Sequence, residues 1–220
     1  MLSELLNIRP GITAVIGGGG KTSLLRALGE ELSSAGTVVL ATSTRIYPFP
    51  GMENVMDPEE AAIREALARD RCVAIGKPAR EGKLAAPTLP FLRLAELADY
   101  VIVEADGAKR LPFKAHGPGE PVIPEGSGQV ILVAGMGAMG KPIREVVHRS
   151  GVFAALAGCG TDAILTPALA ARVMLAEKLH DRVFLNQCEE GYEAALDLAK
   201  YLGCPVAAGS IQKGEYRCLY

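Results

Sequence analysis

The chain has 220 residues, of which 49% are hydrophobic, so it can bury a sizeable core and disorder is not expected. Its formal net charge is −2 with 22% charged residues, which excludes a global field that would draw it to DNA or to an acidic membrane. We therefore expect neither a nucleic-acid partner nor a membrane partner.

The cysteines and the apolar stretches indicate a cellular compartment. The five cysteines form no CxxC pair and no cluster with zinc spacing, and an odd number of this kind is typical of a reducing cytosol. The first residues, MLSELLNIRPG, lack the features of a signal peptide, and Asp162, Pro167 and Arg172 interrupt the alanine-rich stretch 152–176 too early for a membrane span. We predict a cytoplasmic protein in which Cys72, Cys188 and Cys204 are core thiols and Cys218 is exposed.

Short apolar runs alternate along the chain with amphipathic stretches. The segment 57–70 predicts a helix with Asp57 as N-cap and Pro58 at the first helical position. In chain order, the expected strands are 12–17, 37–42, 72–76, 100–107, 129–135, 182–187 and 205–210, and the expected helices are 21–36, 57–70, 89–98, 150–158, 166–177 and 189–202.

This alternation determines the expected fold class. Near-continuous apolar strands separated by helices indicate a mostly parallel sheet covered on both faces. Right-handed crossovers then give a three-layer, doubly wound α/β fold with ligands at the carboxyl ends of the strands. We expect one such domain over residues 1–220.

Residues 14–25, AVIGGGGKTSLL, place four glycines between an expected strand and an expected helix. Glycines allow positive φ angles that turn several amides inward, and the start of the helix adds its positive end. Lys21 would reach the β- and γ-phosphates of a nucleotide, and the Thr22 hydroxyl would bind Mg²⁺. The alternative is a flexible turn that carries a surface lysine.

The match to the usual phosphate loop is incomplete. Val15 stands where G-x-x-x-x-G-K-[ST] requires its first glycine, so the motif here is the shorter G-x-x-G-K-T, which is similar to the phosphate loop of the Mur ligases. We predict a site for ATP or GTP that consists of Gly17, Gly18, Gly19, Gly20, Lys21, Thr22 and Ser23.

Two carboxylates follow the apolar strand that begins at Tyr100. Glu104 stands at the very end of the run and Asp106 two residues later. Nucleotide hydrolases place a carboxylate at the end of a buried strand to hold Mg²⁺, which prefers oxygen ligands. We predict a metal site of Thr22, Glu104 and Asp106, with Lys21, Glu104 and Asp106 taking part in catalysis; the alternative for Asp106 is a simple Asp-Gly turn.

Residues 105–128 are rich in glycine and proline and are too irregular for an ordinary connection, which favours a functional loop. Lys109, Arg110, Lys114 and His116 follow the acids and are expected to face a γ-phosphate or an anionic substrate. Arg110 could act as an arginine finger on the transition state. The alternative is a solvated loop whose charges keep the protein soluble.

With these features, the chain resembles the YqeC-type accessory proteins of selenium-dependent molybdenum hydroxylases. The matching stretches are GGGGKTSLL, GKL, DYVIVEADGAKRLPFKAHGPGEPVIP, GKPIREVVHR and VFLNQCE. The resemblance implies a P-loop NTPase fold and a role in a selenium-containing molybdenum cofactor step, with a hydroxylase apoenzyme or a molybdopterin-type cofactor as partner. Arg45, where the family tends to have histidine, and His116, where it more often has proline, depart from the family pattern.

Two further sites lie at predicted strand ends. Arg45 could point at the ligand or be an ordinary surface arginine, and His148-Arg149 is interpreted as a helix-end pair. Asn186-Gln187-Cys188-Glu189 is a degenerate form of the N-K-x-D motif that reads guanine, although Glu189 could equally be an acid at a helix start. Asn186 and Glu189 are therefore candidate base-binding residues, and the choice between ATP and GTP stays open.

Three functions are compatible with these residues. The first is an Mg²⁺-dependent NTPase or NTP-dependent transferase that acts in cofactor maturation. The second is a nucleotide-gated metallochaperone or switch with little hydrolysis, whose loop 105–128 closes on a partner enzyme. The third is a small-molecule kinase, for which no distinct acceptor motif is present.

Overall fold

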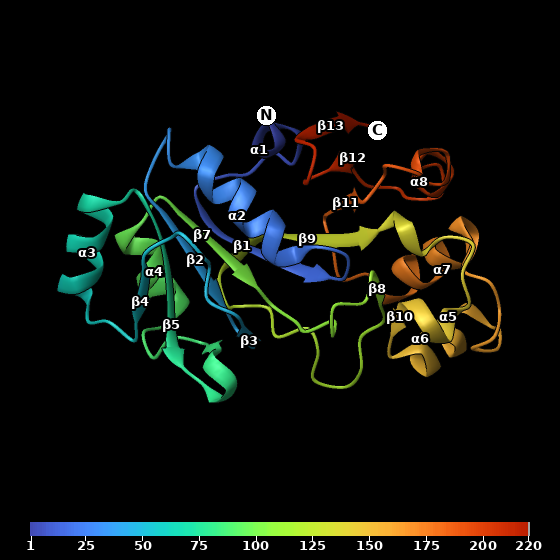
Figure 1. Cartoon of the computed structure of the whole chain (residues 1–220), viewed down its shortest axis with the longest axis horizontal. Helices are drawn as coiled ribbons and strands as arrows, with labels where there is room; N and C mark the ends of the chain where they lie inside the picture. The colour runs from blue at the N-terminus through green and yellow to red at the C-terminus, as the bar shows by residue number, and fades with distance from the viewer. Residues whose placement is uncertain (220) are drawn as a thin grey trace. The chain divides into compact units, whose positions relative to one another are not determined.

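The computed structural model describes residues 1–219 and confirms the α/β class, with helices alternating with mostly parallel strands (Figure 1). The chain divides into two compact units. Unit 1 consists of Met1–Val15, Thr22–Gly107 and Val122–Val130, and unit 2 consists of Ile16–Lys21, Ala108–Pro121 and the described residues from Ile131 onward.

The sheet of unit 1 has the strand order β1-β7-β2-β5-β6-β3, with β4 paired to β5. The pairs are parallel except for β5 with β6 and β6 with β3. Both Val15 and Thr42 lie opposite Glu104 in the register, so this carboxylate ends the middle strand of three. The strands are β1 (Gly11–Gly17), β2 (Val38–Thr42), β3 (Arg45–Ile46), β4 (Asn54–Met56), β5 (Cys72–Pro78), β6 (Leu84–Ala85) and β7 (Tyr100–Glu104).

Helices cover both faces of the unit 1 sheet, as doubly wound topology requires. One face packs in a single apolar cluster against α3 and α4, with Val39, Val73 and Val101 from successive strands. The other face meets α2, whose Gly29 lies against the side chains of Leu40 and Cys72. The helices are α1 (Leu2–Leu5), α2 (Lys21–Leu32), α3 (Glu60–Arg69) and α4 (Phe91–Leu97), with a 3₁₀ turn at Arg80–Gly82.

The main sheet of unit 2 has the order β9-β11-β12-β13, parallel except for β13, which runs antiparallel to β12. A separate parallel pair joins β8 to β10. The strands are β8 (Phe113–Lys114), β9 (Ser127–Gly135), β10 (Val147–His148), β11 (Arg182–Asn186), β12 (Val206–Ser210) and β13 (Glu215–Cys218). The helices are α5 (Ile143–Val146), α6 (Ser150–Ala157), α7 (Pro167–Glu177) and α8 (Tyr192–Ala199), with a 3₁₀ turn at Met136–Ala138.

Helix α3 begins later in the chain than the sequence predicts. It begins at Glu60 with Glu59 as N-cap, so the expected cap at Asp57 is wrong. Asp57 has a φ of 42°, and its carboxylate accepts hydrogen bonds from the amide and the hydroxyl of Thr88, both at 2.9 Å. The side chain that resembles a cap in the sequence therefore fastens the segment before α4 instead.

Of the three expected core thiols, Cys188 is buried, whereas Cys72 and Cys204 are only partly buried, at the edge of the core. Burial raises the pKa of Cys72 to about 12 and that of Cys188 to about 11, and it also raises the pKa of Cys204, while Cys218 is exposed. Over residues 1–219, no helix has both the length and the apolar character needed to cross a bilayer.

Candidate functional site

The four glycines form a tight turn between β1 and α2. Gly17, Gly19 and Gly20 have φ angles of 95°, 78° and 120°, in the left-handed region that favours glycine. The Gly18 amide donates to Val133 O at 2.9 Å, and the Gly19 amide donates to Leu111 O at 3.2 Å. The turn is thus held within unit 2 by strand β9 and by the loop before β8.

A side chain at Gly19 should destabilise the protein. A Cβ there would lie 2.3 Å from Gly135 N, a backbone atom that cannot move aside, and φ is 78°. We expect Gly19→Ala to lower the free energy of unfolding by about 2 kcal/mol. Gly160→Ala, where a Cβ meets nothing within 4 Å, is the matched control in urea unfolding, and equal stability of the two variants would contradict this reading.

Lys21 is folded back over the glycine turn. Its ammonium nitrogen donates to Gly17 O at 2.6 Å, and the residue is only 5% exposed. The Gly18 and Gly19 amides already bind carbonyls, so they are not the donors that a ligand would meet. The start of a helix generally offers the amides of its first turn instead. Helix starts of this kind bind phosphates, and Lys21 is the first residue of α2.

Asn186 fastens the carboxyl end of β11 to the glycine turn. Its side-chain nitrogen donates to Gly19 O at 2.8 Å, and its side-chain oxygen accepts from Ile211 N at 3.1 Å. The residue is 5% exposed, and a Cβ added at Gly20 would lie 2.5 Å from its amide nitrogen. Asn186 therefore shapes the turn, whereas the sequence motif suggested that it contacts the base.

In unit 1, a hydroxyl and a carboxylate meet at the end of β7. Thr22 Oγ1 donates to Glu104 Oε2 at 2.6 Å, and Glu104 O accepts from Thr42 Oγ1 at 2.8 Å and from Ser43 N at 3.1 Å. Glu104 is 7% exposed, and Asp106 is fully buried. Ser23, the next residue of α2, is exposed.

This donor set fits a magnesium ion. Hydroxyl and carboxylate oxygens are its preferred protein ligands, and one or two of them usually suffice because phosphates and water complete the octahedron. Over residues 1–219, no group of three or more acidic, histidine or cysteine side chains could hold a metal without such help. Thr22 and Glu104 are the better candidates, since the buried Asp106 side chain is less accessible.

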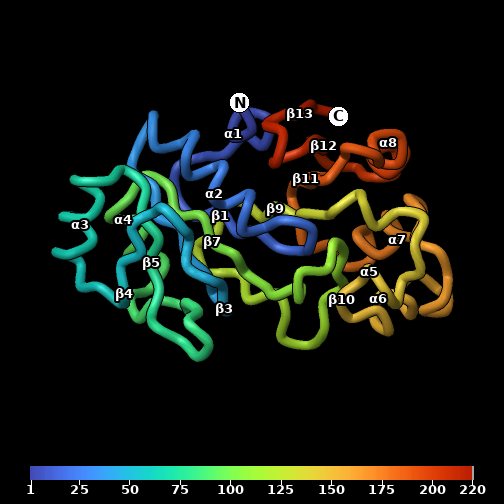
Figure 2. The backbone as a smooth tube through the Cα atoms, in the orientation of Figure 1, coloured from blue at the N-terminus to red at the C-terminus, as the bar shows by residue number. Residues whose placement is uncertain are grey.

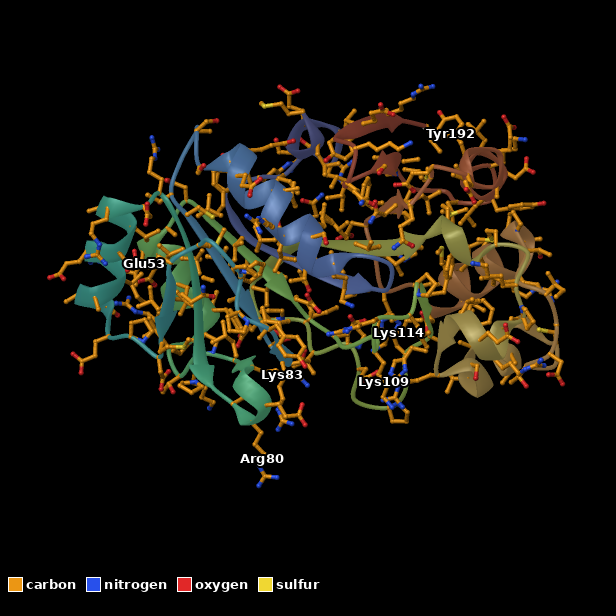
Figure 3. All side chains as sticks on the ribbon, in the orientation of Figure 1. Glu53, Arg80, Lys83, Lys109, Lys114 and Tyr192 are labelled. Atoms are coloured by element: carbon orange, nitrogen blue, oxygen red, sulfur yellow. The ribbon has the colours of Figure 1, made fainter. Side chains whose placement is uncertain are left out.

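The loop 105–128, whose backbone is seen in Figure 2, carries four basic residues and is called the basic loop below. Two of these residues are exposed and two are buried. Lys109 and Arg110 are exposed and have φ angles of 49° and 64°, and Leu111 N donates to Ala108 O at 2.9 Å, as in a type I′ turn. Lys109 is labelled in Figure 3. The exposed cations Lys109 and Arg110 are accessible to an anion.

Lys114 and His116 are instead buried against carboxylates, contrary to the expectation that they face a substrate. The Lys114 ammonium lies 2.8 Å from Glu120 Oε2, and His116 Nδ1 lies 2.9 Å from Glu177 Oε2. Glu177 also accepts from the His116 amide at 2.6 Å. The Lys114 pair closes the loop on itself, and the contact of His116 with Glu177 joins the loop to the end of α7.

Glu120 should make stability dependent on pH. The Arg149 guanidinium at 2.9 Å, together with Lys114, lowers its pKa to about 2 despite burial, which acts in the opposite direction. A carboxyl with a depressed pKa stabilises the fold above its unfolded value of 4.5, and this contribution is lost as the pH falls toward 2. We expect Glu120→Gln to cost about 2 kcal/mol at pH 7, allowing for solvent screening at Arg149.

The measurement is urea unfolding of wild type and Glu120→Gln at pH 7 and at pH 3. The difference between the two proteins should narrow at the lower pH, because the wild-type carboxyl then becomes protonated on unfolding. A difference that is equal at both pH values would show that the ion pairs do not stabilise the loop.

The remaining sequence candidates lie at strand ends. Arg45 is exposed on β3, in unit 1. Glu189 is exposed and precedes α8, which begins only at Tyr192, so it is not an acid in the first turn of that helix. Instead, the Ser210 hydroxyl donates a short hydrogen bond to its Oε1 atom.

Sequence reasoning missed three residues on which these contacts depend, namely Glu120, Glu177 and Ser210. Glu177 is 61 residues from His116 in the chain, and no local pattern joins the two. Ser210 ends an apolar strand, as Glu104 does, and this position was the signal that could have identified it.

Comparisons with known proteins give one family. A family model described as "YqeC protein" matches residues 13–151. The chain is also similar to the "Uncharacterized protein YqeC" of Escherichia coli strain K12, with 35% identity over 166 residues, 71% of this chain and 64% of that relative. The match therefore spans less than two thirds of the relative's length. No solved structure matches the chain.

Proposed function

The chain belongs to the YqeC family, and from the geometry of its glycine turn we propose that it is an Mg²⁺-dependent nucleoside-triphosphate-binding protein of the P-loop type. It would act as an NTPase or an NTP-dependent transferase. The observation that carries this proposal is the hydrogen bond of 2.6 Å between Thr22 Oγ1 and Glu104 Oε2. Thr22 follows Lys21 directly in the chain.

The positions of these groups support phosphate binding. Lys21 and Thr22 are the first two residues of α2, so a triphosphate at the start of this helix would meet the ammonium, the hydroxyl and the amides of the first turn. The ammonium would leave Gly17 O and donate to phosphate oxygens, which are stronger acceptors because they are charged. A flexible surface turn does not require the lysine to be 95% buried.

The Glu104 carboxylate would bind the metal ion. Thr22 and Glu104 would hold Mg²⁺, which neutralises charge on the phosphate oxygens and helps to orient them. Glu104 is kept in place by its main-chain bonds to Thr42 and Ser43, so its carboxylate need not be ordered when the nucleotide arrives. Arg110, which is exposed like Lys109, would stabilise the negative charge that develops in the transition state.

The pathway part of the proposal rests on the family resemblance. The YqeC-type proteins are linked to selenium-dependent molybdenum hydroxylases, so the energy of the nucleotide would be used in maturing a selenium-containing molybdenum cofactor or its apoenzyme. The exposed cations Lys109 and Arg110 would suit the anionic groups of a molybdopterin-type cofactor.

Thermal shift measurements with ATP, GTP, CTP and their diphosphates, each with and without Mg²⁺, test this function. A bound triphosphate at a hundredfold excess over Kd should add about 2.7 kcal/mol of stability. The shift should be larger with Mg²⁺ and larger for triphosphates than for diphosphates. The absence of any nucleotide shift, with and without Mg²⁺, would overturn the proposal.

A second candidate is a nucleotide-gated switch that hydrolyses slowly. It is favoured by hydrogen bonds that connect the loop 105–128 to the residues beside Glu104. Val122 N donates to Ala105 O at 2.8 Å, and Ser43 Oγ donates to Val122 O at 2.6 Å. A movement of Glu104 when the nucleotide or the metal leaves would thus be transmitted directly to the loop. Phosphate release far below one per second until hydroxylase apoenzyme is added would favour the switch over an ordinary enzyme, for which the median is about ten per second.

A further inference from the structure

A small cavity lies in unit 2 at the carboxyl ends of β11 and β12. Its volume is about 200 Å³, below the usual size of pockets that enclose whole ligands, so it suits one ring system of a larger molecule. Ligands of α/β folds bind beyond the carboxyl ends of the strands. Its lining includes Glu189, Tyr192, Ser210, Lys213 and Arg217.

A carboxylate is fixed at the wall of this cavity. The Lys213 amide donates to Ser210 Oγ at 3.1 Å, and the Ser210 hydroxyl donates in turn to Glu189 Oε1. Ser210 is 4% exposed, so the hydroxyl that holds this acid is itself buried. The hydrogen bond from Ser210 lowers the pKa of Glu189, which keeps the group ionised at neutral pH and able only to accept hydrogen bonds.

The cavity is tied to the glycine turn by Asn186. This side chain contacts Gly19 O on one side and Ile211 N, just after β12, on the other. Glu189 follows Asn186 by three residues, which span at most about 10 Å. The separation between a phosphate at the turn and a group at Glu189 is therefore of the order covered by one nucleoside.

We propose that this cavity receives the base of the nucleotide, that the base is guanine, and that Glu189 reads it. The inference rests on the proposed function. The guanine edge presents two neighbouring donors, N1–H and the 2-amino group, to a carboxylate with two acceptor oxygens. Adenine presents an acceptor at N1, which the same carboxylate repels.

The rest of the wall includes aromatic and cationic side chains as well as Glu215. Arg217 lies over the Tyr192 ring, with its guanidinium carbon 5.2 Å from the ring centroid, and Tyr192 is labelled in Figure 3 near the edge of unit 2. Flat side chains of this kind can stack on a base without distinguishing one base from another. Selectivity is thus assigned to Glu189, whose acceptor atoms distinguish the two purines.

The test compares GTP, ATP and xanthosine triphosphate binding, each with Mg²⁺, to wild type, Glu189→Gln and Glu190→Gln by calorimetry. Glu190 is the matched control, because it is exposed and adjacent and does not line the cavity. Wild type and Glu190→Gln should prefer GTP over ATP at least tenfold. Glu189→Gln should lose that preference and gain affinity for xanthosine triphosphate, since an amide can donate to the 2-oxo group of xanthine.

The outcomes separate this inference from the proposed function. If wild type binds GTP and ATP equally, or if Glu189→Gln keeps the wild-type ratio, the assignment of guanine is wrong while nucleotide binding stands. If wild type binds none of the three triphosphates, the proposed function itself fails. A matching loss of preference in Glu190→Gln would show that general charge, rather than Glu189, sets the preference.

Discussion

Lys21→Ala should weaken the binding of Mg²⁺-nucleoside triphosphate by about a hundredfold. The ammonium is buried at the glycine turn and would exchange its bond to Gly17 O for bonds to phosphate. Charge-assisted hydrogen bonds contribute about 1.5–3 kcal/mol each, and about 1.4 kcal/mol corresponds to a tenfold change in affinity. Calorimetric titration of wild type and variant with the triphosphate and Mg²⁺ gives the ratio directly.

Lys200→Ala is the matched control for this lysine. Lys200 also belongs to unit 2, but it is exposed and pairs at 2.7 Å with Asp197. A surface pair of this kind contributes little, so nucleotide affinity should stay within about twofold of wild type. If Lys21→Ala binds the triphosphate as tightly as Lys200→Ala does, the ammonium is not a phosphate ligand.

Glu104→Gln should abolish the benefit that Mg²⁺ brings to triphosphate binding and should reduce any hydrolysis by about a hundredfold. Glutamine keeps the size of the side chain and can still bond to Thr22, but it lacks the negative charge that a divalent cation requires. The measurement is nucleotide affinity in Mg²⁺ and in a chelator, for wild type and variant, together with phosphate release.

Glu96→Gln controls for the loss of one charge in unit 1. Glu96 is exposed on α4 and forms an ion pair with Arg93 at the surface. Its variant should respond to Mg²⁺ as wild type does. Retention of the full Mg²⁺ effect in Glu104→Gln would remove this carboxylate from the metal site, and would leave Asp106 as the candidate to test next.

The parallel part of the fold could be predicted because its strands are apolar over most of their length. Three of the short, mainly apolar runs in the sequence are strands in the structure, namely Val38–Thr42, Tyr100–Glu104 and Arg182–Asn186. Buried strands and the helices between them give strong periodic signals. The α/β class follows from these signals alone.

Elements fixed by distant partners could not be predicted in this way. Strand β13 (Glu215–Cys218) is largely exposed and exists because it pairs with β12, and the two-residue strands β8 and β10 exist only as each other's partner. Asp57 resembles a helix cap in the sequence, yet it binds Thr88, 31 residues away. Local patterns do not contain such contacts.

The candidate site was predictable to a similar extent. The glycine turn, Lys21 and Glu104 are identified by spacing, because each depends on its immediate neighbours in the chain. The roles of Lys114 and His116 were not, since charge alone cannot distinguish a ligand contact from an internal ion pair. Only the positions of Glu120 and Glu177 decide between the two.

Calorimetric titration of the wild-type protein with a nucleoside triphosphate in the presence of Mg²⁺ tests the central claim most directly. We expect one molecule of triphosphate to bind each chain, with an affinity that falls when Mg²⁺ is removed. A titration that gives no saturable binding of ATP or GTP, by a protein shown to be folded, would contradict the claim.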